Sequence, residues 1–495
     1  MKRRKFVQIT GGITVAAGSI STLFASCDDP MMDTMMNMDK APEVVEGLFN
    51  TMLPVPNAVS VDDASLTAQL TTTTVFQGKT SNVLGYQPGS MLGPTLKAAT
   101  GDGLNIVFQN NLFENSNIHW HGLITPAAMD GHPKDIVQSG NSFNYTFPVI
   151  NRSGTYWYHP HPDMRTAKQA YEGLAGLFLV TDVEEQALGL PSGEYELPLV
   201  VQDKRANTSG NFYYLPSGMD LMNGLLGESV LVNGVHAPFT EVVAGYYRLR
   251  VLNGSNGRIY NLGMSNGAPL TIIGTDGGLL SAPEDANSIL LSPGERVDLL
   301  LSFDGLPIGT EVFLESKTFE NSGYQGQQAF RIMKFHVKAG QGVNFTVPAI
   351  LSTYATIPEN QATRQRFFDI TNGGGHGGHG GGMVLHNING RSYDESRIDE
   401  TVTAGTTEIW SFDNVNGVDP HPMHLHGALF QVLDRTGGRG QIYPHEKGWK
   451  DTVLVMPGER VRVIVPFSQN TGIYVFHCHN LEHEDTGMML QMEIS

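Results

Sequence analysis

Four His-x-His pairs constrain the fold of this chain more than any other feature of its sequence. Two pairs lie in the first third of the chain and two lie near its end: His119/His121, His159/His161, His424/His426 and His477/His479. Side chains two residues apart in a β-strand project from the same face, so each pair places both imidazoles on one side of its strand. So regular a set is typical of a metal site. Because its parts lie about 300 residues apart, we expect the first and last domains to meet there.

Composition and local pattern predict an all-β fold. Only 16% of the residues are charged, Gly (57) and Pro (26) are abundant, and short β-branched runs lie between turn residues. A chain of 495 residues is too long for one ordinary core. Pro-Gly-Glu-Arg-Val occurs at 293–297 and again at 457–461, which indicates duplication of one β-sandwich unit. We therefore expect three sandwich domains, at 46–183, 184–345 and 346–495.

The N-terminus predicts export. Arg3-Arg4-Lys5-Phe6 and the mildly apolar stretch after it are typical of a twin-arginine leader, here placed at residues 1–27. The twin-arginine machinery carries folded proteins, which suits a cofactor loaded before transport; an ordinary secretory leader is the alternative. Leu23–Cys27 is similar to a lipoprotein cleavage box, so Cys27 is a candidate lipid anchor. The expected location is the periplasm, either free or anchored to a membrane.

Charge and cysteine content exclude other classes. The net charge of −18 argues against nucleic acid as a partner and mildly favours cationic substrates. With two cysteines, Cys27 at the end of the leader and Cys478 among histidines, a disulfide framework is not expected.

Cys478 indicates which metal the chain binds. On a strand, Cys478 faces away from His477 and His479, so one segment can serve two metal sites. Neutral imidazole suits copper, zinc, iron and nickel, but two imidazoles with a thiolate and a weak axial thioether describe a blue-copper electron-transfer site. The sequence offers that set as His421, Cys478, His483 and Met488. Zinc would not require a redox partner and would leave the remaining histidines unexplained.

Four motifs now resemble a known family. His119-Trp-His-Gly, Trp157-Tyr-His-Pro-His, His421-Pro-Met-His-Leu-His-Gly and His477-Cys-His-x3-His-x4-Met are similar to the copper motifs of multicopper oxidases. The flanking Gly448-Trp-Lys-Asp-Thr-Val resembles bacterial three-domain members, which include copper-efflux oxidases, spore-coat laccases and bilirubin oxidases. The resemblance implies three cupredoxin-like Greek-key β-sandwiches and four coppers per chain.

The resemblance also implies a ligand for every copper. The type 1 copper would bind His421, Cys478, His483 and Met488, and the type 2 copper His119 and His424. The type 3 pair would bind the six remaining members of the pairs: His121, His159, His161, His426, His477 and His479. No ligand position is missing, which argues against copper-free relatives that keep the fold alone.

The implied reaction couples a reductant to O2. A small-molecule or metal-ion reductant gives single electrons to the type 1 copper, and Cys478 passes them through His477 and His479 to the cluster that reduces O2 to water. Glu484 and Asp130 match acidic positions that the family uses for proton delivery. For each of them, a solvated or capping carboxylate is the alternative.

The substrate stays open between two classes. A laccase-like enzyme would oxidise phenols and aromatic amines, whereas a cuprous oxidase would oxidise Cu(I) in copper tolerance. The segment before His421 contains Asp419 but lacks the methionines of a dedicated Cu(I) site, which favours the laccase. The Met-rich tail 28–45 and the Gly-rich loop 372–382, with His376 and His379, favour copper capture; either could instead be a spacer. A non-catalytic copper-binding scaffold is the alternative from another class.

Overall fold

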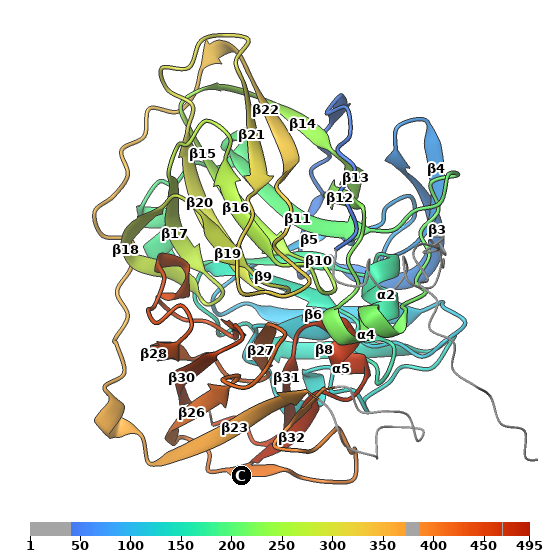
Figure 1. Ribbon diagram of the computed structural model, residues 1–495, viewed down its shortest axis with the longest axis vertical. Coiled ribbons are helices and arrows are strands. Elements are labelled where there is room, and N and C mark those ends of the chain that lie inside the picture. The colour runs from blue at the N-terminus through green and yellow to red at the C-terminus, as the bar shows by residue number, and fades with distance from the viewer. Residues whose placement is uncertain (1–40, 373–385, 468) are drawn as a thin grey trace, which may run out of the picture. The chain divides into compact units, whose positions relative to one another are not determined.

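A computed structural model describes residues 41–372, 386–467 and 469–495 (Figure 1). Strands dominate it, so the predicted all-β fold is confirmed. The α-helices are short: α2 (Thr166–Glu172), α3 (Val183–Ala187), α4 (Gly218–Asn223) and α5 (Leu481–Asp485). Among the described residues, no helix combines the length and apolar character that crossing a bilayer requires. The predicted leader with Cys27, the tail up to residue 40, and His376 and His379 of the loop lie outside the described residues.

The first block of the chain forms two sheets around one core. The five-stranded sheet has the order β2 (Ala58–Ser60), β5 (Thr95–Ala99), β10 (Gly176–Thr181), β9 (Gly154–His159), β7 (His119–His121). The four-stranded sheet has the order β4 (Lys79–Gly85), β3 (Ser65–Phe76), β6 (Gly103–Asn110), β8 (Ser142–Pro148). Alternate residues of β6 are buried and join Trp120 in the core.

The second block contains the two largest sheets. Seven strands run in the order β13 (Val235–His236), β12 (Ser229–Val232), β11 (Glu196–Lys204), β15 (Tyr246–Asn253), β20 (Arg296–Ser302), β17 (Leu270–Thr275), β18 (Gly278–Ala286). Six run in the order β1 (Thr51–Met52), β14 (Pro238–Ala244), β22 (Phe330–Gln341), β21 (Glu311–Ser316), β16 (Tyr260–Met264), β19 (Ile289–Leu291).

The third block again has two sheets. One has the order β24 (His386–Ile388), β23 (Arg364–Asn372), β26 (Thr407–Asp413), β30 (Glu459–Pro466), β28 (Gln431–Gly437). The other has the order β25 (Glu400–Val402), β32 (Met489–Ile494), β31 (Gly472–Cys478), β27 (His421–Leu425), β29 (Thr452–Val455). The core between them contains Trp410, Phe476 and Cys478 itself.

The bounds of the three domains remain a proposal, and strand pairing, core packing and hydrogen bonds favour two adjustments. β1 pairs in parallel with β14 of the second block, and Leu53 after it lies in that block's core. Leu351 packs into the same core, and the Ser352 hydroxyl contacts the carbonyl oxygens of residues 279 and 280 at 3.0 Å each. We therefore propose that the second domain includes the segments around residues 51–53 and 346–352.

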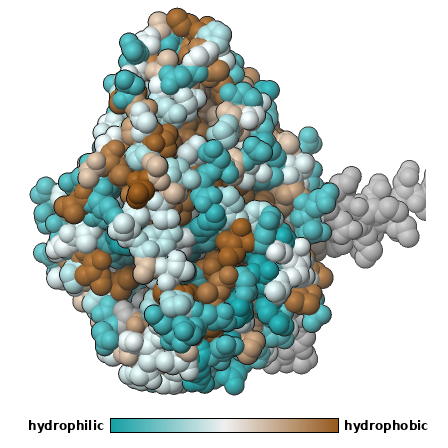
Figure 2. Space-filling view, turned by 90° about the vertical axis from the view of Figure 1, so that its left-hand side faces the viewer, coloured by the Kyte–Doolittle hydropathy of each residue, from teal (hydrophilic) through white to brown (hydrophobic). Residues whose placement is uncertain are grey.

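The surface turned to the viewer in Figure 2 shows several small hydrophobic groups among hydrophilic residues. Apolar atoms contribute much of any folded protein's surface, and large contiguous patches are what mark interaction sites. This face therefore gives no reason to assign a partner to it.

Candidate metal centre

Strands β7 and β9 hold the first two histidine pairs side by side. The strands are antiparallel, and His119 lies opposite His159. Trp120 turns into the first core, so the histidines on either side of it face the other way. His161 follows β9, and the side-chain oxygen of Asn117 accepts a 2.6 Å hydrogen bond from its backbone N–H.

Strands β27 and β31 hold the two later pairs in the same manner. His424 lies opposite His477, and Met423 lies opposite Cys478. Cys478 points into the third core, while His477 points towards the histidines of the first block. The Nε2 atoms of His477 and His161 are 3.2 Å apart.

All eight histidines of the four pairs form one cluster. The Nε2 atoms of His426 and His477 are 3.1 Å apart, and those of His119 and His424 are 3.5 Å apart. The His479 ring lies 4.9 Å from that of His121, measured between centroids. Every member is at most 1% exposed. Segments from both ends of the chain thus meet, and the histidines come together at a buried site.

Hydrogen bonds at the rear of the rings orient the imidazoles. Nδ1 of His119 donates to the Asp130 carbonyl oxygen at 2.7 Å, and Nδ1 of His424 donates to the Asp451 carbonyl oxygen at 2.9 Å. Their Nε2 atoms therefore present lone pairs to the cluster. His121 is held by its other nitrogen, because its Nε2 lies 2.9 Å from Oδ1 of Asp451 and its buried Nδ1 has no hydrogen-bond partner among the described residues.

The donor set fits copper. Burial lowers the pKa of His159 to about 3 and that of His161 to about 4, so these rings are neutral at physiological pH. Nε2 of His159 and both ring nitrogens of His479 are buried and have no hydrogen-bond partner among the described residues. Converging, unpartnered imidazole lone pairs in a dry site are what a soft divalent cation requires.

A second cluster surrounds Cys478. Its Sγ lies 3.5 Å from Nδ1 of His421 and 3.6 Å from Nδ1 of His483, and the two Nδ1 atoms are 3.3 Å apart. Met488 is fully buried, and its backbone carbonyl accepts from the Cys478 N–H at 3.1 Å. Burial raises the pKa of the Cys478 thiol, so a thiolate here requires a bound cation.

The two predicted acids both contact the eight-histidine cluster. Oδ2 of Asp130 lies 2.7 Å from Nδ1 of His426, and burial raises the Asp130 pKa to about 8. Oε2 of Glu484 lies 3.1 Å from Nδ1 of His477. Burial would raise the pKa of Glu484, but His161 and His477 outweigh it and hold that pKa below its usual range.

Asp451 is a site residue for which the sequence predicted no role. It contacts His121 through its carboxylate and His424 through its carbonyl, and it forms a bidentate ion pair with Arg296 at 2.8 and 2.5 Å. The two charged side chains are fully buried. The sequence signal that could have indicated Asp451 is a charged pair, Lys450-Asp451, directly before the apolar strand β29.

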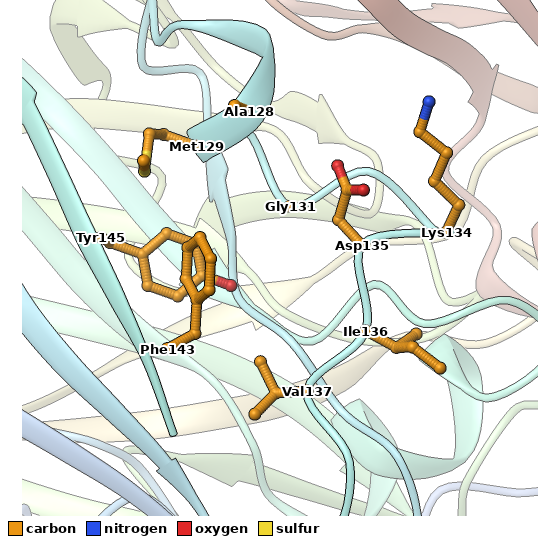
Figure 3. Close-up of a pocket in the computed structure, with 9 residues that line it drawn as sticks. All are labelled: Ala128, Met129, Gly131, Lys134, Asp135, Ile136, Val137, Phe143 and Tyr145. Atoms are coloured by element: carbon orange, nitrogen blue, oxygen red, sulfur yellow. The ribbon is translucent and has the colours of Figure 1, made fainter. Parts of the chain in front are cut away.

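A separate pocket of about 550 Å³ lies next to the segment that carries Asp130 (Figure 3). Met129 and Gly131 line it on either side of Asp130, with Phe143 and Tyr145 among the other lining residues. The Tyr145 hydroxyl accepts a 2.8 Å hydrogen bond from the Ile118 N–H, one residue before His119. One wall of this pocket is therefore built from the chain segments that position the histidine cluster.

Comparison with known proteins gives concordant matches. Two sequence profiles, each described as Multicopper oxidase, match residues 67–185 and 356–495. The chain is 34% identical over 437 residues to "Multicopper oxidase mco" of Staphylococcus haemolyticus, covering 87% of this chain and 88% of that protein. It is 33% identical to the laccase of Bacillus subtilis, covering 83% and 90%. It is also 30% identical to the cell division protein FtsP of Escherichia coli, covering 100% and 99%.

Solved structures agree with these matches. McoA multicopper oxidase from Aquifex aeolicus aligns with a TM-score of 0.81 at 33% identity, covering 91% of this chain and 100% of that one. A multicopper oxidase from Campylobacter jejuni, described as a metallo-oxidase, aligns with a TM-score of 0.77 at 27% identity, covering 93% and 96%. The predicted cupredoxin-like architecture is thereby confirmed.

Proposed function

We propose that this chain, which belongs to the multicopper oxidase family, couples one-electron oxidation of phenols or aromatic amines to four-electron reduction of O2 to water. The family matches make this chain a copper-binding oxidoreductase. One observation carries the proposal: a single segment links the two buried clusters, since Cys478 lies in one and His477 in the other.

We assign four coppers to the two clusters. His421, Cys478, His483 and Met488 would hold the type 1 copper, and His119 and His424 would hold the type 2 copper. The type 3 pair would take the remaining histidines of the cluster: His121, His159, His161, His426, His477 and His479. The orientation of His121 supports this division, because Asp451 occupies its Nε2 and leaves Nδ1 for the metal. Copper, when bound, supplies the reversible one-electron chemistry that none of these side chains provides.

The chain itself supplies connection and protons. Cys478 and its neighbours His477 and His479 join the two sites through a few covalent bonds. Reduction of one O2 to two waters consumes four protons, and we assign their delivery to Asp130 and Glu484. A buried Asp130 with a pKa of about 8 keeps a proton near neutral pH, at 2.7 Å from the His426 ring.

The proposal is tested by copper content, absorption and O2 uptake. Copper-loaded protein should show a thiolate–copper absorption band that bleaches with a reductant and returns with O2. The Cys478→Ser variant should lose the band and O2 uptake while the copper of the histidine cluster remains. A loaded protein that consumed no O2 with any reductant would defeat the oxidase function and favour a non-catalytic copper-binding scaffold.

A cuprous oxidase is the second candidate, and the match to the Campylobacter jejuni metallo-oxidase supports it. Steady-state kinetics with Cu(I), Fe(II), a phenol and bilirubin separate the two substrate classes. Deletion of residues 373–382 should slow Cu(I) oxidation alone if that loop captures copper. Equal losses for Cu(I) and the phenol would contradict capture.

We also propose export through the twin-arginine machinery, with Cys27 as a candidate lipid anchor. Replacing Arg3 and Arg4 together by lysine should retain the protein in the cytoplasm. A Cys27→Ser variant that fractionates like the native chain would contradict lipid anchoring.

A further inference from the structure

The outer nitrogen of His483 is covered by backbone from the second block. His483 turns Nδ1 towards Cys478 and donates from Nε2 to the carbonyl oxygen of Met222, in α4, at 2.9 Å. The side-chain amide of Asn480 lies 3.2 Å from the same Nε2. His483 is 0% exposed. A reductant cannot touch this imidazole without displacing α4.

His386 covers a second side of the same ring. The centroids of His386 and His483 are 3.8 Å apart, and those of His386 and His421 are 5.2 Å apart. Nε2 of His386 donates to the same Met222 carbonyl at 2.8 Å. His386 and His421 are 1% and 0% exposed, so direct contact with either ring is excluded as well.

Helix α4 is fastened over the site at both ends. At its N-terminus, Ser217 and Asp220 of the first turn form a capping box, and Asp220 also pairs with Arg205 at 2.8 and 2.5 Å. After it, the Leu225 N–H donates to Oε2 of Glu482 at 2.9 Å. Glu482 adjoins His483 in α5. Helix α5 therefore carries the ligand His483 and, through Glu482, also holds the end of α4 that covers it.

The outer face of this cover is apolar and open to solvent. Met222 is 40% exposed, although its carbonyl faces the site, and Tyr213 and Leu215 of the same segment are 40% and 74% exposed. Met222 thus has its side chain in solvent and its peptide group against His483.

We propose that the reductant docks on the outer face of α4 at Met222 and that its electron crosses the Met222 peptide to reach His483. This inference rests on the proposed oxidase function. Each reductant loses one electron, a phenol also releases its proton to water, and O2 remains the final acceptor. The apolar surface fits an apolar aromatic donor better than a donor that requires a hydrogen bond from an imidazole.

Charge at position 222 tests the docking site. Ferrocyanide and hexaammineruthenium(II) are the probes, an anion and a cation that donate one electron without a ligand-specific contact. At low salt, Met222→Lys should raise kcat/KM for ferrocyanide roughly three- to tenfold and lower it for the ruthenium complex, and Met222→Glu should do the reverse. High salt should remove both effects.

Two matched variants locate the effect. Val183→Lys places the same charge on an 84% exposed residue of α3, and Val418→Lys places it on a 62% exposed residue before His421. Val183→Lys should change neither rate. If Val418→Lys reproduces the pattern and the Met222 variants do not, docking is beside His421 and the inference is overturned. If the native protein oxidises neither probe, the proposed function has failed instead.

A measurement on copper-free protein checks the cover without turnover. Diethyl pyrocarbonate should label half-buried His336 faster than His483 and His386, as read by mass spectrometry of peptides. Labelling of His483 as fast as that of His336 would show an open imidazole edge and overturn the inference.

Discussion

The two Pro-Gly-Glu-Arg-Val turns share a backbone device. In the first, Oε2 of Glu295 accepts a 2.8 Å hydrogen bond from the Ser292 N–H. In the second, Oε2 of Glu459 accepts a 3.0 Å hydrogen bond from the Met456 N–H. Each glutamate therefore ties the start of its turn in the same way, as duplication of one sandwich unit predicts.

The arginines of these turns have different surroundings. Arg296 is fully buried and pairs with Asp451, which orients His121 and His424. Arg460 is 45% exposed and pairs with Asp413 at the surface. The second block contributes none of the eight paired histidines, yet its copy of the turn supports the cluster from behind. A repeated motif can thus keep its backbone role and differ in what its side chains serve.

Removing the two arginines should give the largest contrast. Arg296→Met leaves Asp451 buried without its cationic partner, so we expect a loss of about 3–5 kcal/mol in the free energy of unfolding and a loss of copper from the histidine cluster. Arg460→Met should cost at most about 1 kcal/mol. Urea unfolding and copper analysis measure both. Equal stability and copper content in the two variants would show that the buried Arg296–Asp451 pair contributes no more than the exposed Arg460–Asp413 pair.

The two glycines of the turns give a smaller, more local contrast. Gly294 and Gly458 have φ of +84° and +80°, so alanine at either should cost about 1–2 kcal/mol in strain. A Cβ at 294 would lie 3.0 Å from the His479 ring, whereas a Cβ at 458 meets nothing within 4 Å. Gly294→Ala should therefore also reduce O2 uptake per bound type 1 copper. Unchanged O2 uptake in Gly294→Ala, with Gly458→Ala as control, would show that His479 has room to move.

The two glutamates should differ in the sign of their pH dependence. Burial raises the pKa of Glu295 above its usual 4.5, although Lys450 opposes the shift. For Glu459 burial also acts upward, but Arg439 and Arg435 outweigh it and lower the pKa. Stability from Glu459 is present above about pH 4.5 and is lost as pH falls through its lowered pKa, whereas stability from Glu295 is lost as pH rises through its raised pKa.

Replacing each glutamate by glutamine tests the direction of its pH dependence. The stability deficit of Glu459→Gln should shrink as pH falls from 6 to 3, and that of Glu295→Gln should shrink as pH rises from 4 to 7. Each unit of pKa difference contributes about 1.4 kcal/mol. Thermal unfolding across this range measures the deficits, and parallel slopes for the two variants would contradict the assignment.

Periodicity and composition predicted much of this molecule. Short β-branched runs between turn residues predicted the all-β fold, and the His-x-His spacing predicted a histidine cluster in which both ends of the chain meet. The contacts of Asp451, Arg296 and His386 were not predicted, although Arg296 lies in a repeated motif and Asp451 in a visible charged pair. Their contacts join segments far apart in sequence, 330 residues for Asp451 with His121 and 155 for Asp451 with Arg296. No local pattern encodes a pairing of that kind.

The two-residue strand β1 affects how this protein can be divided. β1 precedes the first block in sequence but pairs with β14 of the second block. The chain therefore begins in the second block, forms the first block, and then returns to the second. A fragment cut at 183/184 would keep β14 and its parallel neighbour β22 but lose β1, leaving an unpaired strand edge on β14 that invites self-association. During synthesis, β1 stays unpaired until residue 238 has emerged, because Thr51 pairs with that residue. The first block can complete its own sheets before β1 pairs.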